Sequence, residues 1–426
     1  MRYFDITGEL VGIFLLIPIT FFYLFRSIKS IFYIDAFNHL QNHRALLISS
    51  LGIVILHYIL AIYIIYFTEP TGTDVGNFAA WAHGYASDER DHYFTVGAEL
   101  YKQFLSLFFY AFGSSSLLLS CVTIFVFTAA LLMFLKICVL LEIKVKSSLA
   151  ILLFGGLPGF LLITIEPYRE MFIVFFLMTS IYYGIKFRME IRPIYLICSV
   201  VFMVFFGLFH FATMAMAPFI LFVVLIFPIR SGIIFNFNKA IYFPIFIVVV
   251  LIANFSVLNR DMGEVVDLFT INSLSGYIDI VNLHKYDLLA VSAITNYYWH
   301  LDAGSLLGFL YSFFQAFLFY MFKPFVWEIN SLSSLVLSLE GVIRFALVLF
   351  SMRLIFKTKG QMRRVYLLLL LIYIFIESIM AVGTTNAGTA SRHHLLAQWI
   401  VIVLGGSGLI AFMKTLLINA SPKVHN

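Results

Sequence analysis

The chain has 426 residues, of which 62% are hydrophobic and only 12% are charged. This composition excludes a soluble protein, because too little charge is available to cover even one soluble domain, and it predicts a single integral membrane domain of the all-α class over residues 1–426. The net charge of +5 is spread in short clusters, which indicates a topological signal and no nucleic-acid partner.

Long apolar runs predict about eleven transmembrane helices. These runs cover residues 9–25, 45–67, 114–135, 148–165, 170–187, 194–209, 211–228, 240–256, 332–356, 365–382 and 395–418. Two further apolar stretches, 99–113 and 303–322, would break the alternation of the basic loops if they crossed the bilayer. We therefore expect them to be re-entrant or interfacial helices on the outer face.

Basic residues orient these spans. They gather in five loops that fall on one side of the membrane if the N-terminus is outside, and the positive-inside rule makes that side cytoplasmic. The residues are Arg26, Lys29, Arg44, Lys136, Lys144, Lys146, Lys186, Arg188, Arg192, Arg230, Lys239, Lys357, Lys359, Arg363 and Arg364.

The opposite, outer face receives a mixture of Asp, Glu, His and Arg. It collects three segments, residues 68–113, 257–331 and 383–394, together with the short connections around residues 166–170 and 210. Ionisable groups are costly near a bilayer and usually handle ions or substrates. The asymmetry predicts a functional site on the outer face.

Two short motifs supply the first candidates. Asp74 lies in "TGTD" after a predicted span, where a carboxylate could accept a proton from a hydroxyl or merely end a helix. Arg169 and Glu170 lie in "EPYRE", between two spans. Arg169 is suited to bind a phosphate with two hydrogen bonds, whereas Glu170 could bind substrate or simply pair with Arg169.

Histidines and a third cation add to this set. "NAGTASRHH" places Arg392, His393 and His394 after Asn386 in a small, Gly-containing segment. We expect this segment to be an outer loop with three adjacent hydrogen-bond donors. His210 interrupts an apolar run, and it is either a structural histidine or part of the same site.

The motif "KPFVWE" combines Lys323, Trp327 and Glu328. An aromatic ring beside a carboxylate suits a sugar, although a Trp at this depth can also be a simple interface anchor. The acidic residues of the 257–331 segment have no spacing that defines a metal site, and a divalent metal is therefore without support in the sequence. Cys121, Cys138 and Cys198 indicate buried small side chains.

Over residues 60–400, the order of the motifs "GTD", "GAELYKQFLSLFFYAFGSSS", "PYRE", "FH", "KPFVWE…LEG" and "GTASRHH" is similar to that of the Wzy/EpsG-like polysaccharide repeat-unit polymerases. It also resembles their relatives, the GT-C glycosyltransferases that use polyprenyl-linked sugars. The resemblance implies glycosyl transfer from an undecaprenyl (pyro)phosphate carrier at the outer face of the bacterial cytoplasmic membrane. The product would be an O-antigen, capsule or exopolysaccharide.

The resemblance also implies roles for individual residues. Asp74 would be the base, while Arg169, Arg392, His393 and His394 would hold the carrier phosphates. The implied partners are the lipid-linked oligosaccharide, the bilayer, and a chain-length regulator and a flippase of the same pathway. The chain lacks the second acid and metal spacing common in GT-C enzymes, which puts both the metal and the base role in question.

Three alternatives stay open. A GT-C single-sugar transferase would use the same donor, and a transporter or flippase would move the same lipid, although no internal repeat supports it. An acyltransferase could use the "RHH" motif to activate a hydroxyl.

Overall fold

The fold is seen in a computed structural model of the chain. It describes residues 3–32, 43–68, 73–90, 96–143, 147–227, 229, 301–302, 304–384 and 386–420. The predicted span 240–256 lies outside these residues, as does most of the predicted outer segment 257–331. The all-α class is confirmed for the described residues, which form helices and no strand.

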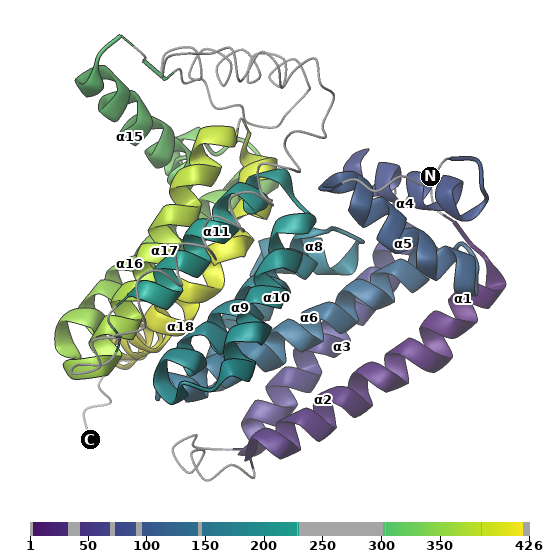
Figure 1. Cartoon of the computed structure of the whole chain (residues 1–426), viewed down its shortest axis with the longest axis horizontal. Coiled ribbons are helices and arrows are strands. Elements are labelled where there is room, and N and C mark those ends of the chain that lie inside the picture. The colour runs from purple at the N-terminus through teal and green to yellow at the C-terminus, as the bar shows by residue number, and fades with distance from the viewer. Residues whose placement is uncertain are drawn as a thin grey trace.

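The helices keep the labels of Figure 1. They are α1 (Ile6–Val11), the π-helical η1 (Gly12–Leu16), α2 (Ile17–Phe32), α3 (His43–Phe67), α4 (Thr73–Ala86), α5 (Ala98–Phe112), α6 (Ser116–Leu140), α7 (Ser147–Gly156), α8 (Pro158–Ile165), α9 (Glu170–Glu190), α10 (Pro193–Leu208), α11 (Phe211–Ile226), α15 (Leu306–Phe322), the 3₁₀ turn η3 (Val326–Glu328), α16 (Leu332–Lys357), α17 (Gly360–Gly383) and α18 (Ala387–Ala420).

Seven stretches of the described chain are long and apolar enough to cross a membrane. They are Ile6–Ser30, Arg44–Phe67, Ser116–Leu140, Glu170–Glu190, Leu332–Lys357, Gly360–Gly383 and Ala387–Met413. The chain is thus a helical membrane protein, while the count of eleven spans stays a prediction. The predicted spans 194–209 and 211–228 coincide with the shorter helices α10 and α11, and the predicted span 148–165 is broken into α7 and α8.

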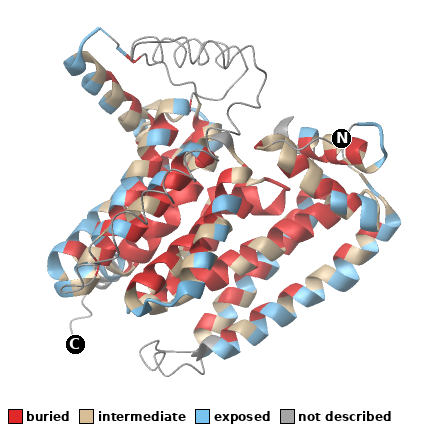
Figure 2. Cartoon of the chain, viewed as in Figure 1, coloured by how far each residue is buried: buried red, intermediate tan, exposed pale blue. Residues whose placement is uncertain are grey.

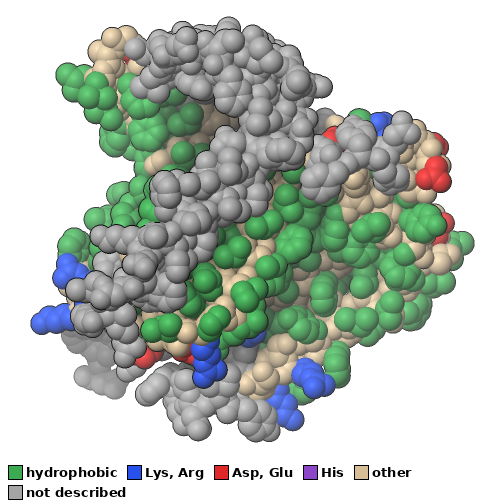
Figure 3. Space-filling model, viewed as in Figure 1, with side chains coloured by type: hydrophobic (Ala, Val, Ile, Leu, Met, Phe, Trp, Pro, Cys, Tyr) green, Lys and Arg blue, Asp and Glu red, His purple; other side chains and the backbone are tan. Residues whose placement is uncertain are grey.

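The long helices lie side by side and form a slanted bundle (Figure 1). Helices α6 and α18 are buried along most of their length, whereas α2 is largely exposed (Figure 2). Hydrophobic side chains cover much of the visible surface, and most of the visible Lys and Arg side chains lie at the lower edge (Figure 3). That edge holds the α9–α10 and α16–α17 turns (Figure 1), which agrees with the predicted grouping of basic loops at one end.

The predicted outer segment 68–113 contains two helices at the opposite end of the bundle, beside the N-terminus (Figure 1). Helix α5 confirms that residues 99–113 are helical. Helix α4 is a correction, because we expected an irregular loop there. Phe78, Ala79, Ala82 and Tyr85 are buried and recur at helical spacing, so one face of α4 packs against the bundle and stabilises the helix.

A second correction concerns "NAGTASRHH", which we expected to be a loop. From Ala387 onward the segment is the start of α18. The Asn386 side chain accepts a hydrogen bond from the Thr389 backbone N–H at 2.8 Å and caps the helix. A good N-cap followed by a long apolar run starts a helix earlier than the small residues suggested.

Helices α16 and α18 pack closely at a glycine. A Cβ atom added at Gly405 would lie 2.1 Å from the Leu347 carbonyl oxygen, whereas one added at Gly52 on α3 would meet nothing within 4 Å.

We therefore expect Gly405→Ala to lower the thermal unfolding temperature of the purified protein, because overpacking costs about 1–3 kcal/mol. Gly52→Ala is the matched control and should leave that temperature unchanged or raise it, since Ala favours a helix over Gly. Equal unfolding temperatures for the two variants would contradict the close α16–α18 contact.

Candidate functional site

Four of the predicted site residues come together where three helices begin. Arg169 immediately precedes α9, His210 is the N-cap of α11, and Arg392 and His393 lie in the second turn of α18. All four side chains are half-buried. They lie at the end of the bundle opposite the basic loops, as the alternation of helices requires.

Ring contacts define the geometry of this group. The His210 and His393 rings are edge-to-face, with centroids 5.8 Å apart. The Arg392 guanidinium carbon lies 5.4 Å from the Tyr168 ring centroid, and that of Arg169 lies 5.9 Å from Phe78 on α4. Two guanidinium groups thus flank two imidazoles, and aromatic rings lie beside the guanidinium groups.

The His210 imidazole has a defined hydrogen-bond role. Burial lowers the pKa of His210 well below its usual value, and the nearby charges of Arg169, His393 and Arg392 lower it further. Its Nδ1 atom accepts the Ala212 backbone N–H at 3.1 Å, so the proton of the neutral ring lies on Nε2. His210 is therefore a neutral hydrogen-bond donor through Nε2.

The His393 imidazole has the opposite arrangement. The Thr384 hydroxyl donates its only proton to the Met380 carbonyl at 2.7 Å, so at 2.8 Å it accepts from His393 Nδ1–H. In a neutral His393 ring, Nε2 is then unprotonated and can accept a proton. A proton-accepting imidazole thus lies beside a proton-donating one, between two guanidinium groups.

Two carboxylates predicted for the site are placed differently. Asp74 is the second residue of α4, one turn before Phe78, and its side chain lies outside the described residues. Glu170 is buried in the first turn of α9, where a carboxylate interacts favourably with the helix dipole. Its Oε2 atom has no hydrogen-bond partner among the described residues.

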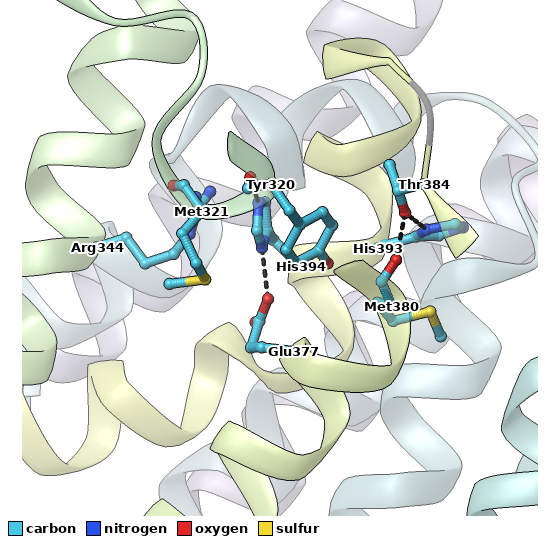
Figure 4. Close-up of polar contacts among 8 residues, drawn as sticks. All are labelled: Tyr320, Met321, Arg344, Glu377, Met380, Thr384, His393 and His394. Carbon is cyan, nitrogen blue, oxygen red and sulfur yellow. Dashed lines mark hydrogen bonds and ion pairs between the residues drawn. The ribbon is translucent and has the colours of Figure 1, made fainter. Parts of the chain in front are cut away.

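His394 points away from this group (Figure 4). Its Nε2 atom lies 3.1 Å from the Tyr320 carbonyl oxygen, and its Nδ1 atom lies 2.6 Å from Glu377 Oε2. Because a carbonyl only accepts, Nε2 carries a proton, and a second proton lies between Nδ1 and the carboxylate. Either Glu377 is protonated or His394 is a cation, and in both cases the pair has no net charge.

Sequence reasoning missed this interior cluster. Glu340 accepts the Gly159 backbone N–H at 2.7 Å, and Arg344 donates to the Met321 carbonyl at 2.8 Å. Both residues are buried in α16. The signal was available, because Glu340, Arg344 and Glu377 are ionisable residues inside predicted spans. The analysis examined only the ends of the spans.

The remaining predicted residues lie on the α15 side of α18. Lys323 Nζ is 3.6 Å from Glu328 Oε1, and the Phe325 backbone N–H donates to Glu328 Oε2 at 2.9 Å. Trp327 is 81% exposed and stacks on Phe325. The contacts among these residues shape their own turn, while Asn386 caps α18.

No group of three or more His, Cys, Asp or Glu side chains in the described ranges is arranged to hold a metal. No protein-family model, curated protein or solved structure matches the chain. The functional conclusion therefore rests on the site itself and on the motif resemblance.

The neutral Glu377–His394 pair leads to a prediction. Glu377→Gln should unfold at nearly the wild-type temperature, because the amide N–H can donate to His394 Nδ1 and the pair stays neutral. Glu377→Leu leaves that buried nitrogen without a partner, which should cost about 1–3 kcal/mol. The measurement is thermal unfolding in detergent, and a Gln variant as unstable as the Leu variant would contradict a neutral pair.

Proposed function

We propose that the protein is a membrane glycosyltransferase that uses a polyprenyl-(pyro)phosphate-linked sugar donor and most likely extends a surface polysaccharide by whole repeat units. The observation that carries the proposal is the group of Arg169, His210, Arg392 and His393. It combines permanent cations with a proton-accepting imidazole at a membrane-protein surface.

The two guanidinium groups suit the leaving group of this reaction. The acceptor hydroxyl oxygen attacks the anomeric carbon of the donor sugar, and the bond from that carbon to the phosphate oxygen breaks. The electron pair leaves with the phosphate, so negative charge develops there. Arg169 and Arg392 can stabilise that charge by charge-assisted hydrogen bonds, and His210 Nε2–H can add a third donor.

The proton of the acceptor hydroxyl needs a base. His393 Nε2 can accept it, and the Met380–Thr384–His393 chain of hydrogen bonds holds the ring for that role. The imidazolium formed lies beside the departing phosphate and stabilises it. Asp74 stays a prediction for the same role or for positioning the acceptor.

The class is supported by the motif order described above, and the choice of a polymerase over a GT-C single-sugar transferase comes from that resemblance alone. The surface glycan of a deletion strain separates the alternatives. Single repeat units without polymer indicate a polymerase, and a repeat unit that lacks one sugar indicates a transferase. Complete repeat units retained on the inner leaflet indicate a flippase.

Arg392 is expected to bind the carrier phosphate with two hydrogen bonds. Arg392→Ala should reduce transfer from purified lipid-linked donor about ten- to a hundred-fold, because one charge-assisted hydrogen bond contributes about 1.5–3 kcal/mol. Arg392→Lys keeps the charge but loses the planar fork, so it should be impaired less severely. Wild-type turnover and donor affinity in Arg392→Ala, at matched protein levels, would overturn the assignment.

Thr384 tests the proposed base. Thr384→Val keeps the shape but removes the acceptor for His393 Nδ1–H, so kcat should fall about ten-fold or more while the KM for donor changes little. Thr384→Ser retains the hydroxyl and should restore most of the rate. If Val and Ser variants have the same kcat, Thr384 does not orient a catalytic imidazole.

A further inference from the structure

A groove lies between α16 and α18 at the end of the bundle that carries the basic loops. It has a volume of about 460 Å³ and is lined by Phe350, Arg353, Leu354, Lys357, Leu404, Ser407, Gly408, Ala411 and Phe412. The end is far from the four-residue site along both helices, since Arg392 and Phe412 are twenty positions apart on α18. The groove therefore belongs to another part of the molecule.

The lining combines two chemistries. Phe350, Leu354, Leu404 and Phe412 supply apolar walls along about two turns of each helix. Arg353 and Lys357 are exposed and lie four residues apart, so both project from one face of α16. An occupant must therefore be apolar along most of its length and anionic at one end.

Small residues leave room for this occupant. Ser407, Gly408 and Ala411 line the α18 side, and a Cβ atom added at Gly408 would lie 2.8 Å from the Phe350 ring. A larger residue at position 408 would push that ring into the groove. The space thus depends on small side chains on α18 and on the position of Phe350.

More positive charge lies close by in sequence and in space. A second, smaller hollow at the start of α17 is lined by Gly360, Arg363, Arg364 and Leu367. The positive-inside rule places this basic end on the cytoplasmic side, where membranes carry their anionic lipids. Basic pockets between transmembrane helices on that side are suited to lipid headgroups.

We propose that the α16–α18 groove binds an anionic diacyl phospholipid of the adjacent leaflet. Arg353 and Lys357 contact its phosphate, and an acyl chain lies against Phe350, Leu404 and Phe412. The proposal depends on the membrane location of the chain and not on the proposed glycosyl transfer.

The test is native mass spectrometry of the purified full-length protein with phosphatidylglycerol or phosphatidylcholine of identical acyl chains. Wild-type protein should bind the first phosphatidylglycerol more tightly than phosphatidylcholine. Arg353→Gln combined with Lys357→Gln should weaken phosphatidylglycerol binding about 30-fold and leave phosphatidylcholine binding unchanged. The control is Arg192→Gln, which removes an exposed cation at the same end of the bundle and should change neither affinity.

A second variant tests the apolar part of the groove. Ser407→Phe fills the groove without changing its charge and should weaken both lipids. Equal binding of the two lipids to the wild type, or an unchanged affinity in the double Gln variant, would overturn the proposal. Undecaprenyl phosphate that displaces phosphatidylglycerol from the wild type, but not from the double variant, would replace the phospholipid with a carrier lipid and also overturn it.

Discussion

Backbone groups at helix ends that lie inside an apolar bundle must find partners within the protein, because lipid offers none. The interior charges of this protein meet that requirement. Glu340 accepts a backbone N–H at the start of α8, while Arg344 and His394 donate to carbonyls in the last turn of α15. An acidic group at a helix N-terminus and donors at a C-terminus also match the helix dipoles. The broken span and the short outer helix depend on these three contacts.

The same contacts determine where the candidate site faces. Successive residues on a helix are about 100° apart, so three adjacent side chains of α18 point in three directions. His394 is held between Glu377 and α15, which directs His393 toward Thr384 and His210 and leaves Arg392 beside Tyr168. "RHH" is therefore not one cluster of donors. Two of its members belong to the partly exposed group, and the third anchors the helix that carries them.

Sequence patterns predicted the class and much of the organisation. Long apolar runs are a strong signal because a helix in lipid must bury about twenty residues, and basic residues gathered at one end as the positive-inside rule predicts. The convergence of Arg169, His210, Arg392 and His393 was predicted as a shared outer face. The partners of each ring could not be predicted, because they depend on how α18 rotates against α15 and α17. Helix α4 was missed because its Gly and Asp residues suggested a turn.

The central claim is that Arg169 and Arg392 hold the phosphates of a polyprenyl-linked donor while His393 faces the acceptor. The most direct test is an experimental structure of the protein in lipid with a non-hydrolysable polyprenyl-pyrophosphate sugar bound. We predict phosphate oxygens at about 2.7–3.2 Å from guanidinium nitrogens of both arginines, with the anomeric carbon on the His393 side. Phosphates bound elsewhere, for example beside Lys323 at the α15–α16 turn, would contradict the account.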